Sequence, residues 1–335
     1  MSDRASPARP EGMTTITAPP STQPLLADTP DGATLDRVLL VRDAERRTKR
    51  DGEPYLRLTL SDRSGTLAAV LWEAESAPPV GSAVRATGNV AEHARYGRQL
   101  VLSGLRPAAP EEVVWAELLD GPDRAPEELD HDLDVLVGSV ADPSLAELLA
   151  RLLGPSTETG RRFRSIPAAK YHHHAYPHGL LDHSVAVART VSAVAAATPG
   201  VDRELAVAGA LLHDVGKLEA YDVVGGCAQL NDAGRLVGEI PLGFARVRGH
   251  VEAIDGFPAE RAHALLHIIL SHHGRLEHGS PVTPCTREAT LVHAMDELSG
   301  RMGAFDRLEK ATPAGEAWSR FDRVLDGAAF LGPAR

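Results

Sequence analysis

The 335-residue sequence predicts a multidomain α+β protein, in which a small all-β barrel precedes a larger all-α domain. Three observations support this prediction. A chain of this length is long for one compact domain and comfortable for two. Apolar residues alternate with a period of two near the N-terminus, and their spacing becomes helical further along. Glycine and proline punctuate these segments, and no internal repeat is seen.

Composition and charge exclude several classes of protein. A net charge of −11 argues against a protein that coats nucleic acid non-specifically, although an enzyme can handle nucleic acid through one local patch. The two cysteines, Cys227 and Cys285, form no C-x-x-C pair and predict neither a disulfide framework nor a zinc knuckle. The sequence shows neither a membrane-length apolar stretch nor a signal peptide. We therefore expect a cytoplasmic protein without a membrane partner.

The first third of the chain contains a tail followed by a strand pattern. Residues 1–33 are rich in proline, serine and threonine without apolar periodicity, which predicts a disordered tail. Within residues 34–108, Leu56, Leu58 and Leu60 alternate with Tyr, Arg and Thr, as a half-buried strand does. Four further strands are predicted over residues 37–46, 66–72, 82–90 and 99–106. Five short strands are the number expected of an OB-fold barrel.

The predicted barrel is the basic part of an acidic chain, because residues 35–106 contain 12 Arg and Lys residues against 9 Asp and Glu residues. OB barrels bind single strands with rings that stack on bases and cations that follow phosphates. The candidates for nucleic-acid binding are Tyr55, Trp72, Tyr96, Arg47, Lys49 and Arg98. Two alternatives stay open. Trp72 follows an apolar run and is equally suited to closing the barrel, and arginines near turns are typical of solvated loops.

The rest of the chain has helical periodicity. Residues 109–160 carry acidic, amphipathic stretches, with Leu133, Leu136 and Val140 at helical spacing, and predict a helical linker. From Ile166 to the end the sequence is typical of helices separated by Gly and Pro loops. We place an all-helical domain at residues 161–312 and a C-terminal tail at residues 313–335.

Histidine and aspartate recur on four successive apolar helices of this domain. The residues are His183 at the start of the first, His213 and Asp214 near the end of the second, His272 and His273 closing the third, and Asp296 within the fourth. Each position alone is explained equally well by a core histidine or a helix-end contact. Apolar faces exclude unpaired polar groups, however, and one kind of divalent ion can pair with all of them. The set therefore predicts a metal site.

The ligand types indicate the chemistry. Mixed imidazole and carboxylate ligands suit Mn²⁺, Fe²⁺, Co²⁺, Ni²⁺ or Zn²⁺. Asp214 is placed to bridge two ions, and two ions about 3.5–4 Å apart can activate a water and neutralise charge on a phosphodiester. Lys217, one turn beyond His213, is a candidate phosphate contact and equally an ordinary solvated lysine. These residues predict a divalent-metal phosphodiesterase.

The ligand order His, His-Asp, further His, then Asp resembles the HD phosphohydrolase superfamily. More specifically, the motifs resemble those of the YhaM-type 3′–5′ exoribonucleases. The matching stretches are residues 168–174, 179–183, 211–217, 269–274 and 279–282 in the HD domain, and 52–56 and 60–65 in the OB barrel. The resemblance spans residues 35 to 310. An OB barrel followed by these HD motifs is a specific combination.

The resemblance implies an enzyme, usually with Mn²⁺ or Co²⁺, that removes nucleotides from the 3′ end of single-stranded RNA or DNA. The barrel would hold the strand, and the helical domain would cut it. The ligands of one ion would be His183, His213, Asp214 and Asp296, and those of a second ion would be Asp214, Glu239, His272 and His273. The phosphate contacts would be Lys217, Lys170 and His173.

One position departs from the family pattern. Gly238-Glu239-Ile240 stands where Gly-His-Ile is typical of the family. Glu239 can itself ligate a divalent ion, His250 can fill the gap, or the position binds no ion. Two other functions also stay open: hydrolysis of mononucleotides or cyclic dinucleotides, and single-strand binding with a decayed catalytic site. The sequence does not distinguish RNA from DNA and leaves the native ion and oligomeric state open.

Overall fold

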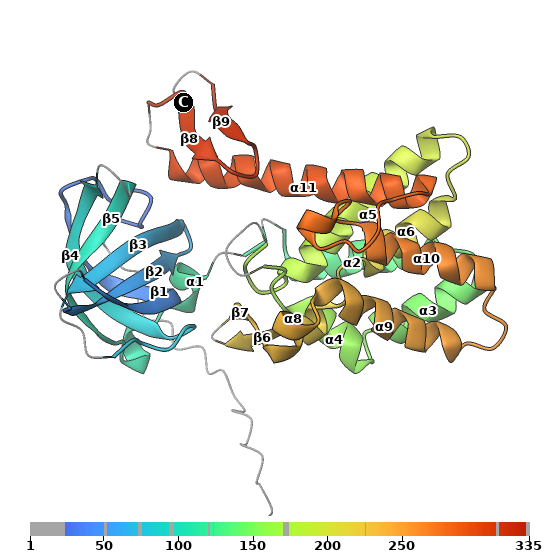
Figure 1. Cartoon of the computed structure of the whole chain (residues 1–335), viewed down its shortest axis with the longest axis horizontal. Helices are drawn as coiled ribbons and strands as arrows, with labels where there is room; N and C mark the ends of the chain where they lie inside the picture. Colours follow the sequence, from blue (N-terminus) through green and yellow to red (C-terminus); the bar gives the residue numbers. More distant parts are fainter. Residues whose placement is uncertain are drawn as a thin grey trace, which may run out of the picture.

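The computed structural model describes residues 24–49, 52–72, 76–93, 97–119, 121–122, 124–169, 174–224, 226–312 and 315–332. A closed β-barrel lies beside a larger helical body, and a long helix, α11, runs along one side of that body toward the barrel (Figure 1). This arrangement confirms the predicted fold class, an all-β barrel followed by a helical domain.

Five strands form the barrel: β1 (Thr34–Thr48), β2 (Pro54–Asp62), β3 (Gly65–Trp72), β4 (Ala83–His93) and β5 (Gly97–Pro107). Their order around the barrel is β1-β2-β3-β5-β4, with β3 and β5 parallel and the other neighbours antiparallel. Leu56, Leu58 and Leu60 all point into the core, as their alternation predicts. The long strand β1 pairs with β4 from Thr34 to Leu40 and with β2 from Leu40 to Thr48, and a register shift between Val41 and Asp43 interrupts the second pairing.

The segment before β1 packs against the barrel, so the prediction of a disordered tail is wrong for residues 24–33. Leu26 is only 2% exposed within the barrel core, and its N–H donates to Asp62 Oδ2 at 2.8 Å. Arg98 holds the same segment, because its guanidinium donates to the carbonyls of Leu26 and Thr29 and pairs with Asp31 at 3.1 Å. A single buried leucine in a polar stretch produces no periodic pattern in the sequence. Its burial could not be predicted because it depends on contacts with the folded barrel.

The helical body is built from α2 (Pro126–Gly138), α3 (Pro143–Leu153), α4 (Glu158–Ser165), α5 (Gly179–Ala197), α6 (Arg203–Leu212), α7 (Lys217–Ala220), α8 (Asp232–Leu236), α9 (Glu239–Glu252), α10 (Ala259–Ser271) and α11 (Arg287–Ala311), with the short α1 (Trp115–Leu118) nearer the barrel. Leu133, Leu149 and Phe163 are buried in one core with the side chains of α5 and α6. Helices α2 and α3 are therefore part of this domain, which corrects the prediction of a linker through residue 160.

Two helices that position the functional site begin at capping residues. The Asp202 side chain accepts a hydrogen bond from the Leu205 N–H at the start of α6, and Thr286 accepts one from the Ala289 N–H at the start of α11. Such caps pair orphan N–H groups of the first helical turn. Within the described residues, α5 alone is long and apolar enough to cross a membrane, but half of that window is buried in the helical body, as in a core helix.

Two β-hairpins interrupt the region that the sequence predicts to be entirely helical. One consists of β6 (Tyr221–Val224) and β7 (Cys227–Leu230), and the other of β8 (Trp318–Asp322) and β9 (Gly327–Phe330), within the predicted C-terminal tail. Strands of four or five residues are too short to show a clear period. These hairpins are the part of the fold that the sequence analysis missed.

Both hairpins lie on the barrel side of the helical body (Figure 1), and both contact barrel residues. At β7, Gln229 Nε2 donates to Val80 O at 3.2 Å, and Cys227 packs against barrel residues. Arg42 of β1 is 6% exposed and donates to Ala175 O, in the loop before α5, at 3.3 Å. At β8, Arg320 pairs with Glu92 of β4 at 3.1 Å. The barrel is thus directly hydrogen-bonded to the loop that leads into the functional site.

We predict that Leu26→Ala lowers the free energy of unfolding of the barrel by about 2–5 kcal/mol, the usual effect of truncating a fully buried leucine. Urea denaturation followed by tryptophan fluorescence measures this change. The control is Leu236→Ala, because that side chain is 85% exposed and its loss should leave stability nearly unchanged. Equal stability of both variants would show that residues 24–33 do not belong to the barrel core.

Candidate metal centre

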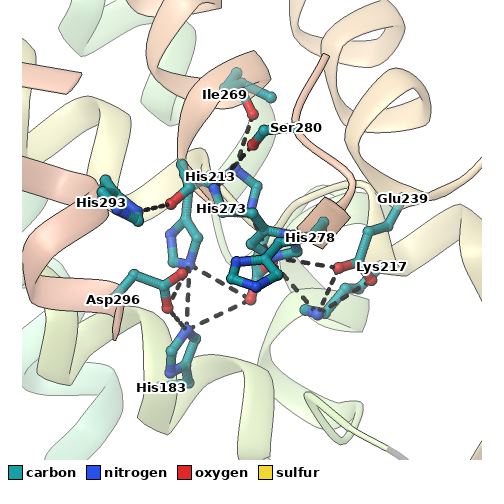
Figure 2. Close-up of polar contacts among 12 residues, drawn as sticks. His183, His213, Lys217, Glu239, Ile269, His273, His278, Ser280, His293 and Asp296 are labelled. Atoms are coloured by element: carbon teal, nitrogen blue, oxygen red, sulfur yellow. Dashed lines mark hydrogen bonds and ion pairs between the residues drawn. The ribbon is translucent and has the colours of Figure 1, made fainter. Parts of the chain in front are cut away.

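Four ligand-type atoms converge where the ends of α5 and α6 meet α11. His183 Nε2 lies 3.1 Å from His213 Nε2, 3.1 Å from Asp296 Oδ1 and 3.4 Å from Asp214 Oδ2. The side chains of His183, His213 and Asp296 point toward one another (Figure 2). Atoms bound at about 2.1 Å to one ion lie about 3–3.5 Å apart. The spacing of these four residues therefore fits the ligands of one divalent ion.

A second group of ligand-type atoms faces the other oxygen of Asp214. His272 Nε2 lies 3.6 Å from Asp214 Oδ1, and ligand atoms of Asp214, His272 and His273 all lie within 4.8 Å of one another. In the part of the chain that the structure describes, Asp214 Oδ1 and His272 Nε2 are buried without a hydrogen-bond partner. Such atoms need a partner, and a cation between them would supply it. Asp214 is thus oriented as a bridging carboxylate.

Helix ends orient three of the imidazole rings. His213 Nδ1–H donates to Ala210 O at 2.7 Å, and His272 Nδ1–H donates to Ile269 O at 2.8 Å. These carbonyls lie in the last turns of α6 and α10, where helical carbonyls have no helical partner. His273 Nδ1–H donates in the same way to His278 O at 2.8 Å. With Nδ1 protonated, the neutral ring presents its Nε2 lone pair to the site.

Two residues that the sequence analysis missed hold the His272-His273 turn. His293 Nδ1–H donates to His272 O at 2.7 Å, and Ser280 Oγ accepts a hydrogen bond from the His273 N–H at 3.0 Å (Figure 2). Gly274 has a φ of +76°, and a Cβ there would lie 2.3 Å from the His293 ring. His293 lies about one turn before Asp296 on α11, on the same face of the helix. That spacing could have indicated from the sequence that His293 lies near the site.

Lys217 and Glu239 form an ion pair beside the second group. Lys217 Nζ lies 3.0 Å and 3.1 Å from the two carboxylate oxygens of Glu239, and 3.4 Å from Asp214 Oδ1. Glu239 Oε1 lies 3.8 Å from His273 Nε2. The close approach depends on Gly216, because a Cβ there would lie 2.0 Å from the Glu239 carbonyl oxygen. The glycine after the His-Asp pair therefore lets α7 pack against α9.

Charges compensate one another in this buried cluster. Burial alone lowers the pKa of His213, but the carboxylates of Asp214 and Asp296 raise it to about 9. Burial alone raises the pKa of Asp214, but Lys217 and His213 hold it well below its usual range. Without a metal ion, protonated His213 and Lys217 thus supply the positive charge. A divalent ion would take the place of the His213 proton.

The loop before α5 adds His174, which the sequence analysis passed over in favour of His173. His174 has a left-handed φ of 58°, and its ring centroid lies 5.4 Å from that of His183. Its Nδ1 lies 3.2 Å from Asp182 Oδ2 and 2.9 Å from the Tyr176 hydroxyl, which itself donates to Asp182. The run of three histidines in the sequence was the available signal for this residue.

Three predicted site residues lie outside the described residues: Lys170, His173 and the barrel residue Tyr96. His250 is eleven residues beyond Glu239 on the same helix, α9, roughly 16 Å along its axis. The alternative in which His250 replaces Glu239 as a ligand is therefore wrong.

The barrel candidates divide into two sets. Tyr55 and Trp72 face each other across β2 and β3 with ring centroids 5.2 Å apart, and Lys49 Nζ lies 4.9 Å from the Trp72 ring centroid. Trp72 is 46% exposed, so it does not close the barrel core. Arg47, at the same end of β1, pairs with Glu45 at 2.8 Å on the surface. Arg98 instead holds residues 24–33 through its guanidinium. Its role as a phosphate contact stays a prediction.

Comparison with known proteins agrees with this geometry. A family model described as "HD domain" matches residues 180–301. The 3′-5′ exoribonuclease YhaM of Listeria innocua is 31% identical over 316 residues, covering 92% of this chain and 98% of the relative. The chain belongs to the YhaM family. YhaM of Bacillus subtilis is 31% identical, covering 90% of this chain and 96% of the relative, and YhaM of Listeria monocytogenes serotype 4b is 32% identical, covering 92% and 98%.

Membership of the YhaM family confirms the resemblance inferred from the motifs. The HD domain of this YhaM-family chain coincides with the helices that carry His183, His213, Asp214 and Asp296. Together, the HD domain and the histidine–aspartate cluster identify the chain as a metal-dependent hydrolase with a divalent-metal site.

We predict that Mn²⁺ raises the melting temperature of the protein and that Asp214→Asn abolishes this shift, because Asp214 faces both groups of ligands. An ion at 100 times its Kd stabilises the folded state by about 2.7 kcal/mol. Differential scanning fluorimetry, with metal content measured by mass spectrometry, tests the prediction. Asp255→Asn is the control, since Asp255 is exposed in the turn after α9. Retention of the shift in Asp214→Asn would contradict the assigned centre.

Proposed function

We propose that this protein is a 3′–5′ exonuclease that hydrolyses the terminal phosphodiester bond of single-stranded RNA. The observation that carries the proposal is the Asp214 carboxylate, whose two oxygens face two separate groups of histidine and carboxylate ligands. That arrangement suits a two-ion site for phosphodiester hydrolysis. The relatives named 3′-5′ exoribonuclease YhaM, which cover nearly the whole chain, support the direction of cleavage and the substrate.

In this proposal, His183, His213, Asp214 and Asp296 hold one ion, and Asp214, Glu239, His272 and His273 hold the other. Mn²⁺ or Co²⁺ fits the imidazole and carboxylate donors. When bound, such ions activate a water molecule and neutralise charge on the phosphodiester. The phosphate contacts are Lys217, Lys170 and His173. Both cysteines are free thiols, which supports a reducing cytoplasm as the site of action.

The chain's own residues prepare the site in two ways. Backbone carbonyls accept from Nδ1 of His213, His272 and His273 and so hold each ring with Nε2 free to bind an ion. Lys217 carries a positive charge that is largely shielded from solvent and therefore strongly attracts an incoming phosphate oxygen. Positioning and charge stabilisation are the main contributions that a protein can make to phosphoryl chemistry.

The barrel would hold the strand through the pair of Tyr55 and Trp72. An exposed tryptophan beside a tyrosine offers a face on which a base can stack, and Lys49 over the same ring places a cation where the phosphate backbone would pass. Arg47 lies on the neighbouring part of β1. The four residues thus form a stacking platform at one end of the barrel.

The nuclease proposal is tested with purified protein, Mn²⁺ and a 5′-labelled single-stranded RNA, with the same sequence in DNA alongside. We expect a descending ladder of RNA products that disappears with chelator and with Asp214→Asn. Faster cleavage of RNA than of DNA would establish the sugar preference. Intact strands in the presence of bound Mn²⁺ would contradict the proposal and favour a small phosphodiester as the substrate.

The role of the platform is tested by Trp72→Ala. Loss of one stacking contact weakens binding by about 1–3 kcal/mol, so we expect KM for a long strand to rise roughly 5- to 150-fold. Hydrolysis of bis-p-nitrophenyl phosphate, which needs no strand-binding surface, should be unchanged. Trp318→Ala, which removes a 58% exposed tryptophan on the β8–β9 hairpin, is the matched control. An unchanged KM in Trp72→Ala would show that the RNA strand binds at a surface other than the Tyr55–Trp72 platform.

A further inference from the structure

The ammonium group of Lys217 occupies a position that a second divalent ion would need. Its Nζ lies 3.0 Å and 3.1 Å from the two oxygens of Glu239 and 3.4 Å from Asp214 Oδ1. All three side chains are mostly buried, with exposed fractions of 13%, 18% and 5% for Lys217, Glu239 and Asp214. The Lys217 ammonium is therefore the cation that pairs with both carboxylates in the protein without metal (Figure 2).

The same oxygens are the ones that face the second histidine pair. Asp214 Oδ1 lies 3.6 Å from His272 Nε2, and Glu239 Oε1 lies 3.8 Å from His273 Nε2. A divalent ion bound by His272, His273 and these two oxygens would be in contact with atoms that Lys217 already contacts. Two cations this close in a low-dielectric site repel each other strongly. Lys217 and the second ion thus compete for the same ligands.

Charge balance leads to the same conclusion. Asp214, Glu239 and Asp296 carry three negative charges when ionised, and the histidine ligands are neutral when they bind metal. One divalent ion and the Lys217 ammonium together carry three positive charges. A second divalent ion would leave an excess of two positive charges in a buried site, which is unfavourable unless an anion enters with it. The anion that the proposed reaction brings is the phosphate of the substrate.

We propose that the substrate-free protein binds one divalent ion tightly and that Lys217 blocks the second position until a phosphate group arrives. Lys217 then moves from Asp214 and Glu239 to the phosphate, and Glu239 becomes a ligand of the second ion. The long, flexible lysine side chain permits this movement without a change in α7. The inference rests on the proposed function, because it concerns the second of the two ion positions and a phosphate substrate.

The experiment is a calorimetric titration of the full-length protein with Mn²⁺, with and without adenosine 5′-monophosphate, and it requires no catalysis. Wild type should bind one equivalent tightly without the nucleotide and two equivalents with it. Lys217→Met should bind the second equivalent without nucleotide, about tenfold or more tightly than wild type, because the competing charge is gone. Lys217→Arg retains the charge and should not show this gain. Glu239→Gln should weaken binding of the second equivalent in the presence of nucleotide.

Lys310→Met, at the end of α11, is the control lysine and should behave as wild type. Two equally tight equivalents in wild type without nucleotide, or one equivalent regardless of nucleotide, would overturn the inference. The comparison of wild type with and without nucleotide uses no variant, so a folding defect in Lys217→Met does not prevent the test. If the titration gives the expected result but RNA is not cleaved, the proposed nuclease activity is rejected. The dependence of the second ion on a bound phosphate would still stand.

Discussion

The burial of the Asp214 carboxylate is the constraint on which the rest of the site depends. A carboxylate that is 5% exposed stays ionised only if cations and hydrogen-bond donors surround it. Histidines from three helices and the Lys217 ammonium lie around it. Burial raises the pKa of Asp214, but Lys217, His213 and His272 hold it well below its usual range. The helical body is arranged around this one side chain, since α5, α6, α10 and α11 each bring a residue to it or to its immediate neighbours.

Backbone geometry at helix ends makes this convergence possible. His213 and His272 stand at the C-terminal ends of α6 and α10, where unpaired carbonyls accept from Nδ1 and direct Nε2 inward. Gly216 allows α7 and α9 to touch, and Gly274 leaves room for the His293 ring. The rings of His213 and His272, two of the candidate ligands, are therefore fixed by main-chain contacts as well as by side-chain packing, which limits how far they can move when a charge enters or leaves.

The barrel is connected to this centre by specific contacts. Arg42 of β1 bonds to the carbonyl of Ala175, one residue after His174, and His174 packs against the ring of His183. The β6–β7 hairpin follows α7 directly and carries Cys227 into the barrel contact. A nucleic-acid strand bound at the Tyr55–Trp72 pair would therefore be held by a barrel that is hydrogen-bonded to the loop carrying His174, beside the metal site.

The sequence by itself predicted the barrel, the helical domain and the set of candidate metal ligands. Strand alternation has a strict period, and polar residues on apolar helices require partners, so both signals are local. Only the tertiary structure decided the placement of Leu26, the two short hairpins, the role of Arg98 and the positions of His174 and His293. Above all, it paired Glu239 with Lys217. Those features depend on contacts between segments far apart in the chain, and a linear pattern contains no distances between such segments.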